Sequence, residues 1–188
     1  MVSPGFLFQS LIENTLLTGM PNRLIVPLLI VLASACGSGL IGQQGPAACT
    51  VSRVSDGDTF RCRDGRRVRL TGIDGPELEQ QPFGLASRAA LLRLLPPGIT
   101  VRLETDVAPL DQYGRVLAYA WSGDTLINEV MLRNGWAVLY TVPPNIKYVE
   151  RLARAQKEAR SNHAGLWSEG GFDCPPSQFR RNHCLSRP

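Results

Sequence analysis

Residues 49–62 read CTVSRVSDGDTFRC, and two alternating segments in this stretch surround the dipeptide Asp56-Gly57. Asp-Gly between two such segments is a strong signal for a β-hairpin. Cys49 and Cys62 flank the turn, so a hairpin would place them opposite each other. We therefore expect a hairpin that a disulfide between these two cysteines can close.

The next segment, residues 66–73, alternates again and predicts a further strand. Val68 and Leu70 fall on one face of this strand, while Arg67 and Arg69 fall on the other. If the apolar pair points into a core, Arg69 points to the sheet surface, where a site can form. The simpler alternative is an ordinary solvated arginine on a strand.

The rest of the chain mixes helical periodicity with two more strands. Residues 84–95 carry Leu85, Ala89, Leu91, Leu92 and Leu95 at helical spacing before Pro96-Pro97-Gly98 ends the pattern. We expect strands at 100–104 and 116–121, and helices at 126–134 and 147–161. This order of elements predicts an α+β fold, a five-stranded OB-fold β-barrel with about three helices.

Composition places the chain among globular proteins. Its 188 residues are 44% hydrophobic and 19% charged, which fits one domain with tails and excludes global disorder. The net charge of +4 favours a polyanionic partner, although the excess is small.

The amino-terminal segment has the pattern of an export signal. Arg23 precedes the apolar run Leu24–Leu32, and Ala33-Ser34-Ala35 follows as a small-residue cleavage site. The run is too short to span a bilayer as a mature helix. Translation can also begin at Met20. Cys36, directly after Ala33-Ser34-Ala35, resembles the cysteine of a bacterial lipoprotein cleavage site. We expect export, with free secretion, a periplasmic location and lipid anchoring to the cell envelope all left open.

Cysteine usage agrees with an oxidising compartment. Apart from Cys36, the cysteines are Cys49, Cys62, Cys174 and Cys184, which allow three pairings. We favour Cys49 with Cys62, and Cys174 with Cys184. The expected organisation is a signal region at 1–35, a linker at 36–48, the domain at 49–167 and a cysteine-containing tail at 168–188.

The charged residues between 58 and 115 suit metal-assisted phosphate chemistry. Asp58 and Asp74 supply the oxygen ligands that a hard cation prefers. Glu77 follows a stiff Gly-Pro step and can orient a water, while Arg69 and Arg115 can hold one phosphate from two sides. Each residue alone also has an ordinary interpretation, such as a turn aspartate, an Asp58–Arg69 pair or a surface glutamate.

Three motifs together resemble the staphylococcal nuclease (thermonuclease) family. They are Asp56-Gly57-Asp58-Thr59, the stretch RLTGIDGPE at 69–77 and DQYGR at 111–115. Their order and internal spacing match the family from about Val51 to Trp167.

The resemblance implies a role for each matched residue. Asp58, Asp74 and the main-chain carbonyl of Gly75 match the calcium ligands, which leaves Asp56 as a turn residue. Arg69, Glu77 and Arg115 match the catalytic arginine, glutamate and second arginine. Tyr113 matches a tyrosine near the nucleotide phosphate, and Tyr140 matches a nucleotide-stacking aromatic.

The chain also departs from the family pattern. Gly75 stands where threonine is frequent, Gln112 stands where lysine is common, and the loop at 78–83 is short. These differences affect the expected affinity for metal and substrate. They leave the residues for metal, water and phosphate in place.

Two functions therefore follow from the sequence. The first is an exported, calcium-dependent nuclease, expected to be monomeric, that cleaves DNA and RNA to 3′-phosphate products and prefers single strands. The second is a non-catalytic OB-fold module that binds nucleic acid or a protein at the cell surface.

Overall fold

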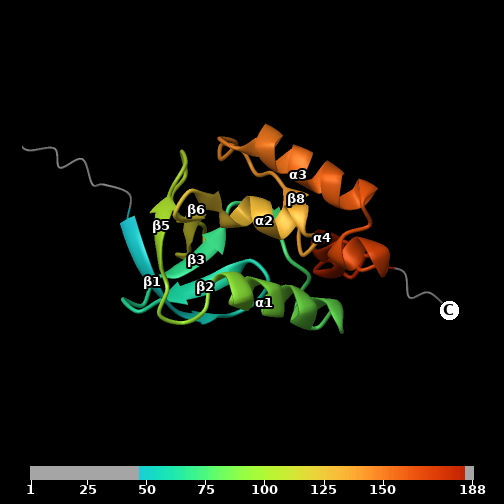
Figure 1. The fold of residues 1–188 in the computed structure, drawn as a ribbon, viewed down its shortest axis with the longest axis horizontal. Helices are drawn as coiled ribbons and strands as arrows, with labels where there is room; N and C mark the ends of the chain where they lie inside the picture. The colour runs from blue at the N-terminus through green and yellow to red at the C-terminus, as the bar shows by residue number, and fades with distance from the viewer. Residues whose placement is uncertain (1–46, 185–188) are drawn as a thin grey trace, which may run out of the picture. The chain divides into compact units, whose positions relative to one another are not determined.

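The computed structural model describes residues 47–184, in which five strands form a closed β-barrel beside the helices (Figure 1). The barrel strands are β1 (Ala47–Val54), β2 (Thr59–Cys62), β3 (Arg67–Leu70), β5 (Thr100–Glu104) and β6 (Val116–Ser122). They follow the order β3-β2-β1-β5-β6, and a parallel pairing of β3 with β6 closes the ring. The short β7 (Thr125–Leu126) pairs with the last two residues of β6. The predicted α+β fold with a five-stranded OB-type barrel is confirmed.

The hairpin in residues 49–62 forms as expected. β1 and β2 are antiparallel, with Val54 opposite Phe60 and Val51 opposite Cys62. Cys49 and Cys62 form a disulfide with their Cα atoms 5.4 Å apart. The second disulfide joins Cys174 to Cys184, at 5.5 Å. Both favoured pairings are confirmed.

β3 shows the expected two faces and then leaves the barrel. Val68 and Leu70 are fully buried, whereas Arg69 lies on the other face. Gly72 has φ +81°, a left-handed conformation that suits glycine, and the chain bends there into β4 (Gly72–Asp74). β4 pairs with β8 (Val138–Tyr140) outside the barrel. The bend brings Asp74 back beside Arg69.

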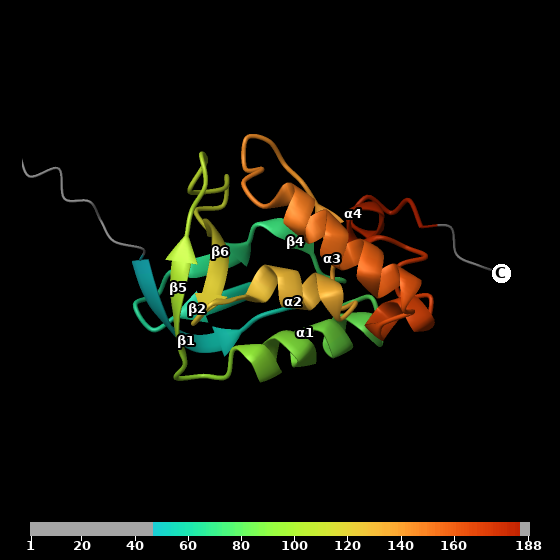
Figure 2. The same ribbon diagram turned by 45° about the horizontal axis from the view of Figure 1, so that its top comes forward.

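The helices lie on one side of the barrel strands in both ribbon views (Figure 1 and Figure 2). They are α1 (Phe83–Leu94), α2 (Ile127–Arg133) and α3 (Val149–Ser161), followed by a 3₁₀ turn, η1 (Gly165–Ser168), and the short α4 (Pro176–Phe179). The three predicted helices are confirmed. α4 was not predicted and lies in the cysteine-containing tail.

Only some of the regularly spaced apolar residues of α1 are buried. Leu85 and Leu92 are 48% and 40% exposed, whereas Gly84, Ser87 and Leu91 are buried. A Cβ at position 84 would lie 2.0 Å from the Glu77 carbonyl oxygen, so only glycine allows this close approach. Backbone contact with the site loop and burial of Leu91 therefore set the rotation of α1 together.

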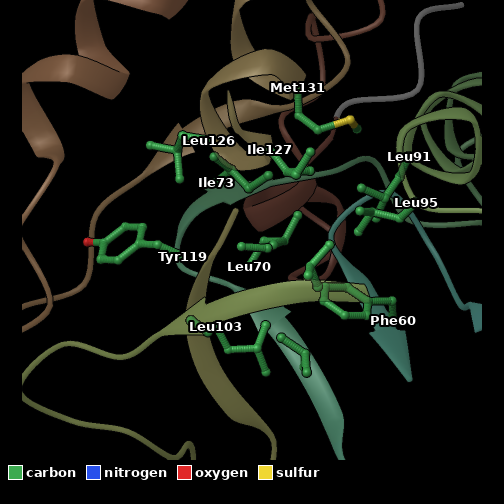
Figure 3. Packing of buried hydrophobic residues seen from close by; sticks show 14 of the residues in the cluster. Phe60, Leu70, Ile73, Leu91, Leu95, Leu103, Tyr119, Leu126, Ile127 and Met131 are labelled. Carbon is green, nitrogen blue, oxygen red and sulfur yellow. The ribbon is translucent and has the colours of Figure 1, made fainter. Parts of the chain in front are cut away.

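One core joins the barrel to α1 and α2. Figure 3 shows side chains from the strands and from both helices gathered together, among them Phe60, Leu70, Tyr119, Leu91, Ile127 and Met131. A buried asparagine, Asn128, ties α2 to the strands. Its Nδ2 donates to the Thr71 carbonyl at 2.8 Å, and its Oδ1 accepts from the Ala120 N–H at 3.0 Å. This side chain fixes the position of the β3–β4 bend.

The predicted signal segment, the lipoprotein cysteine Cys36 and the alternative start at Met20 lie outside the described residues. Within residues 47–184, no helix is both long enough and apolar enough to cross a membrane.

Candidate active site

The predicted site residues all line one pocket of about 790 Å³. They are Asp58, Arg69, Asp74, Gly75, Glu77, Tyr113, Arg115 and Tyr140. They come from the β1–β2 turn, β3, β4 and the loop after it, the β5–β6 loop and β8. The fold therefore brings residues from distant parts of the chain to one surface.

Asp58 and Asp74 converge on a single guanidinium. Arg69 Nε lies 3.0 Å from Asp58 Oδ1, and Arg69 Nη2 lies 2.9 Å from Asp74 Oδ1. The two aspartates are only 6% and 1% exposed. Arg69 Nη1 also donates to the carbonyls of Leu70 and Ile73, each at 2.7 Å. The ordinary Asp58–Arg69 pair thus exists, but it belongs to a larger cluster that includes the second predicted metal ligand.

The Asp56-Gly57-Asp58 turn is held against β4 and α1. Asp56 Oδ1 accepts the N–H of Asp58 at 3.0 Å, as a turn residue does. The N–H of Gly75 donates to Asp58 Oδ2 at 2.7 Å. A Cβ on Gly57 would lie 2.0 Å from Ser87 Oγ, so α1 packs directly on the turn. The orientation of Asp58 therefore depends on three separate segments.

Two carboxyl groups in this part of the pocket lie where burial opposes their ionisation. Burial, together with the nearby negative charge of Asp58, raises the pKa of Asp56 to about 7. Burial also raises the pKa of Asp74, although Arg180 and Arg69 oppose the shift. Both shifts disfavour the charged form of these carboxyl groups.

Glu77 is bound by an arginine from the carboxyl-terminal tail. Arg180 Nη1 donates to Glu77 Oε1 at 2.5 Å, and the same guanidinium contacts Asp74. Gln80 supports the Glu77 loop, because its Oε1 accepts the Glu77 N–H at 2.9 Å and its Nε2 donates to the Cys174 carbonyl at 3.0 Å. The tail therefore contacts the Glu77 loop at two points.

Arg115 is oriented by Asp111. Asp111 Oδ2 accepts from Arg115 Nε at 2.7 Å, while Oδ1 accepts the N–H groups of Tyr113 and Arg115, each at 2.9 Å. Burial alone would raise the pKa of Asp111, but these hydrogen bonds outweigh it and hold that pKa below its ordinary value. The guanidinium of Arg115 also lies 5.5 Å from the centre of the Tyr113 ring. Asp111 thus stabilises the loop at 111–115 and fixes the orientation of the Arg115 side chain.

The two tyrosines lie at the rim of the pocket. Tyr113 is 65% exposed and Tyr140 is 38% exposed. Tyr140 is opposite Gly72 in the β4–β8 pair, which places it beside the bend in the chain. Exposed aromatic rings beside an arginine-containing pocket are suited to stacking with bases.

The donor atoms of the pocket suit a hard cation such as Ca²⁺. Among residues 47–184, no group of three or more His, Cys, Asp or Glu side chains is arranged to hold a metal. Asp58 and Asp74 supply two adjacent carboxylates, so a cation here would complete its shell with main-chain carbonyls and waters. Calcium accepts such mixed oxygen shells, which generally bind with modest affinity.

An OB-type barrel with an acidic pocket flanked by arginines defines a class of protein suited to phosphate chemistry. The staphylococcal nuclease homologue family matches residues 67–169, which is more than half of the chain. The chain belongs to the staphylococcal nuclease family. The resemblance seen in the three sequence motifs is therefore confirmed.

Individual relatives agree with this assignment. A thermonuclease of Staphylococcus intermedius is 42% identical over 125 residues, covering 62% of this chain and 74% of that protein. Endonuclease YncB of Bacillus subtilis is 32% identical over 133 residues, covering 65% of this chain and 63% of that protein. A probable staphylococcal-like nuclease, CAN2 of Oryza sativa, is 38% identical over 123 residues, covering 64% of this chain and 31% of that protein.

Sequence reasoning did not identify Arg180, Asp111 or Gln80 as parts of the site. Asp111 begins the third motif, and its spacing of four from Arg115 was the available signal. Arg180 has a weaker signal, since it is only one of several arginines in the tail. Its position between the paired cysteines 174 and 184 was the one clue to an ordered location.

Proposed function

We propose that the protein is a calcium-dependent nuclease that hydrolyses phosphodiester bonds in DNA and RNA. The observation that carries this proposal is the pocket in which Asp58, Asp74, Glu77, Arg69 and Arg115 come together. Its family membership and its nuclease relatives support the same reaction class. Calcium dependence rests on the carboxylate pair and on the family resemblance.

The side chains divide the work of hydrolysis by their chemistry. Glu77 would orient the attacking water or accept its proton, because its carboxylate lies in the pocket and is partly exposed to water. Arg115, aimed by Asp111, would bind a phosphoryl oxygen and stabilise the charge that builds up at phosphorus. Arg69 would act from the opposite side, beside the aspartates. A cation held by Asp58, Asp74 and the Gly75 carbonyl would polarise the phosphoryl group.

The proposed substrate is a single strand, cleaved to leave a 3′-phosphate. Tyr113 and Tyr140 support this preference, because their exposed rings can stack only on bases that are not paired. Comparing cleavage of one labelled sequence as a single strand and as a duplex tests the preference. Treating the fragments with a 3′-phosphatase tests the product, since only 3′-phosphate ends would change mobility.

The experiment that tests the function is cleavage of single-stranded DNA with calcium, and then with a chelator. We expect cleavage only with calcium, and we expect Arg115→Ala to lose about 100- to 1000-fold in rate, as when one donor to a developing oxyanion is removed. Arg154→Ala is the matched control, because Arg154 is an exposed arginine on α3 that does not line the pocket. Equal rates with and without chelator would contradict calcium dependence. A fully active Arg115→Ala protein would contradict the assigned role.

We also propose that the protein is exported. The two disulfides support this, because such bonds persist mainly in oxidising compartments. Mass spectrometry of the mature amino terminus tests the mode of export. A diacylglycerol on Cys36 would indicate an envelope lipoprotein, whereas a free amino terminus beyond residue 35 would indicate secretion or a periplasmic enzyme.

A further inference from the structure

Arg180 places a positive charge on two carboxylates of the candidate active site. Its Nη2 lies 2.9 Å from Asp74 Oδ2, and its Nη1 donates to Asp74 Oδ1 at 3.1 Å and to Glu77 Oε1 at 2.5 Å. The contact with Asp74 is therefore bidentate, which is the strong geometry for an arginine and a carboxylate. Both oxygens of Asp74 accept hydrogen bonds from Arg180.

The fold of the tail sets this position. Arg180 follows α4 directly, and the Cys174–Cys184 disulfide closes the loop that contains both. The Cys174 carbonyl accepts a hydrogen bond from Gln80, so the loop is attached to the Glu77 segment at its first cysteine. Arg180 itself is 40% exposed and reaches the nearly buried Asp74 from the solvent side. An arginine placed in this way can leave the site without unfolding the barrel.

A guanidinium and a divalent cation at Asp74 compete for the lone pairs of the same two oxygens. They also repel each other at short distance, and the repulsion corresponds to roughly tenfold in affinity for charges about 5 Å apart in water. Resting on the proposed calcium site, we propose that Arg180 is an intramolecular competitor for the cation. The disulfide-closed tail thus sets the calcium concentration that the site requires.

The experiment is calorimetric titration of CaCl₂ into the intact, oxidised protein at constant ionic strength. Arg180→Gln removes the charge and keeps a polar side chain. Arg181→Gln is the matched control, because Arg181 is the adjacent exposed arginine and its loss changes the net charge equally. We expect Arg180→Gln to bind calcium about tenfold more tightly than the parent. Arg181→Gln should stay within about twofold of the parent, because its charge lies outside the pocket.

A second variant tests the role of the loop. Cys174→Ser/Cys184→Ser frees the tail but keeps Arg180, and we expect it to tighten calcium binding by about threefold, a part of the Arg180→Gln effect. In the Arg180→Gln background the same cysteine changes should add nothing, because the competitor is already gone. Circular dichroism and thermal melting would verify that each variant is folded.

Three outcomes would overturn the inference. One is an affinity of Arg180→Gln equal to or weaker than that of the parent. Another is an equal gain for Arg181→Gln, which would indicate a general effect of net charge. The third is a cysteine effect of the same size in both backgrounds. Absence of calcium binding in every variant, with cleavage that resists chelators, would overturn the proposed calcium dependence as well.

Discussion

Replacement of Asp111 by asparagine tests whether Arg115 must be held in position, because the variant keeps Arg115 but removes the carboxylate oxygen that binds it. The amide oxygen of the introduced side chain would still accept the two main-chain N–H groups that now bind Oδ1. The amide nitrogen would replace Oδ2 and cannot accept from Arg115 Nε, which is 2.7 Å away. Asp111→Asn should therefore preserve the loop and release the guanidinium.

The magnitude follows from the bond that is lost. A hydrogen bond to a charged group contributes about 1.5–3 kcal/mol, and partial exposure of this pair favours the lower end. About 1.4 kcal/mol corresponds to tenfold in rate, so we expect kcat/KM on single-stranded DNA to fall about tenfold. The free energy of unfolding should change by less than about 1 kcal/mol, because the loop lies on the surface.

A double-mutant cycle with Arg115→Ala tests whether Asp111 acts on the rate through Arg115. Once Arg115 is absent, Asp111→Asn should have no further effect on kcat/KM, because the side chain that it positions is gone. An unchanged rate in Asp111→Asn would refute the positioning role. So would a tenfold loss that persists in the Arg115→Ala background.

Three further predictions concern the supports of the site and the core. Asn128→Ala should lower the free energy of unfolding by about 2–4 kcal/mol, because it leaves buried main-chain groups unpaired; urea denaturation measures this, with the exposed Asn134→Ala as control. Gly57→Ala should cost about 1–3 kcal/mol in the same assay, because its methyl group would meet Ser87 Oγ at 2.0 Å, and the cost should be smaller when it is introduced into a Ser87→Gly background. Burial alone would raise the pKa of Glu104, but hydrogen bonds from Lys147 and two aromatic side chains hold that pKa below its ordinary value. Glu104→Gln should therefore cost about 1 kcal/mol above pH 4.5, and the difference should vanish as the pH falls through the lowered pKa of the folded state.

Local patterns allowed the first hairpin, its disulfide and the direction of Arg69 to be predicted, whereas the other site residues were predicted from the three motifs that resemble the family. The Asp56-Gly57 turn and the flanking cysteines fixed the first hairpin and its disulfide, because both depend on residues close in sequence. Alternation in β3 then assigned Arg69 to the face opposite the core. With the register of β3 known, the direction of its arginine follows from the two-residue period of a strand.

The contacts that sequence could not predict depend on packing between distant segments. Arg180 reaches Glu77 across 103 residues, through a short helix that carries no strong propensity signal. The spacing of apolar residues in α1 did not show which of them are buried: Leu91 is, whereas Leu85 and Leu92 are exposed, and a close backbone approach at Gly84 sets this arrangement. Periodicity reports apolar content, and it does not report which face must touch another backbone.

The two arginines assigned to phosphate are held in different ways, and the difference bears on how the site can vary. Arg69 is fixed by main-chain carbonyls and nearly buried carboxylates, so moving it would leave the nearly buried Asp58 without its arginine partner. Arg115 belongs to a surface loop, where a single partly exposed carboxylate holds it and salt screens the pair. Gln112, a departure from the family pattern, lies in that same loop. If the proposed function holds, changes in the loop would alter how the substrate is held without disturbing the core, whereas changes beside Arg69 would alter the fold and the chemistry together.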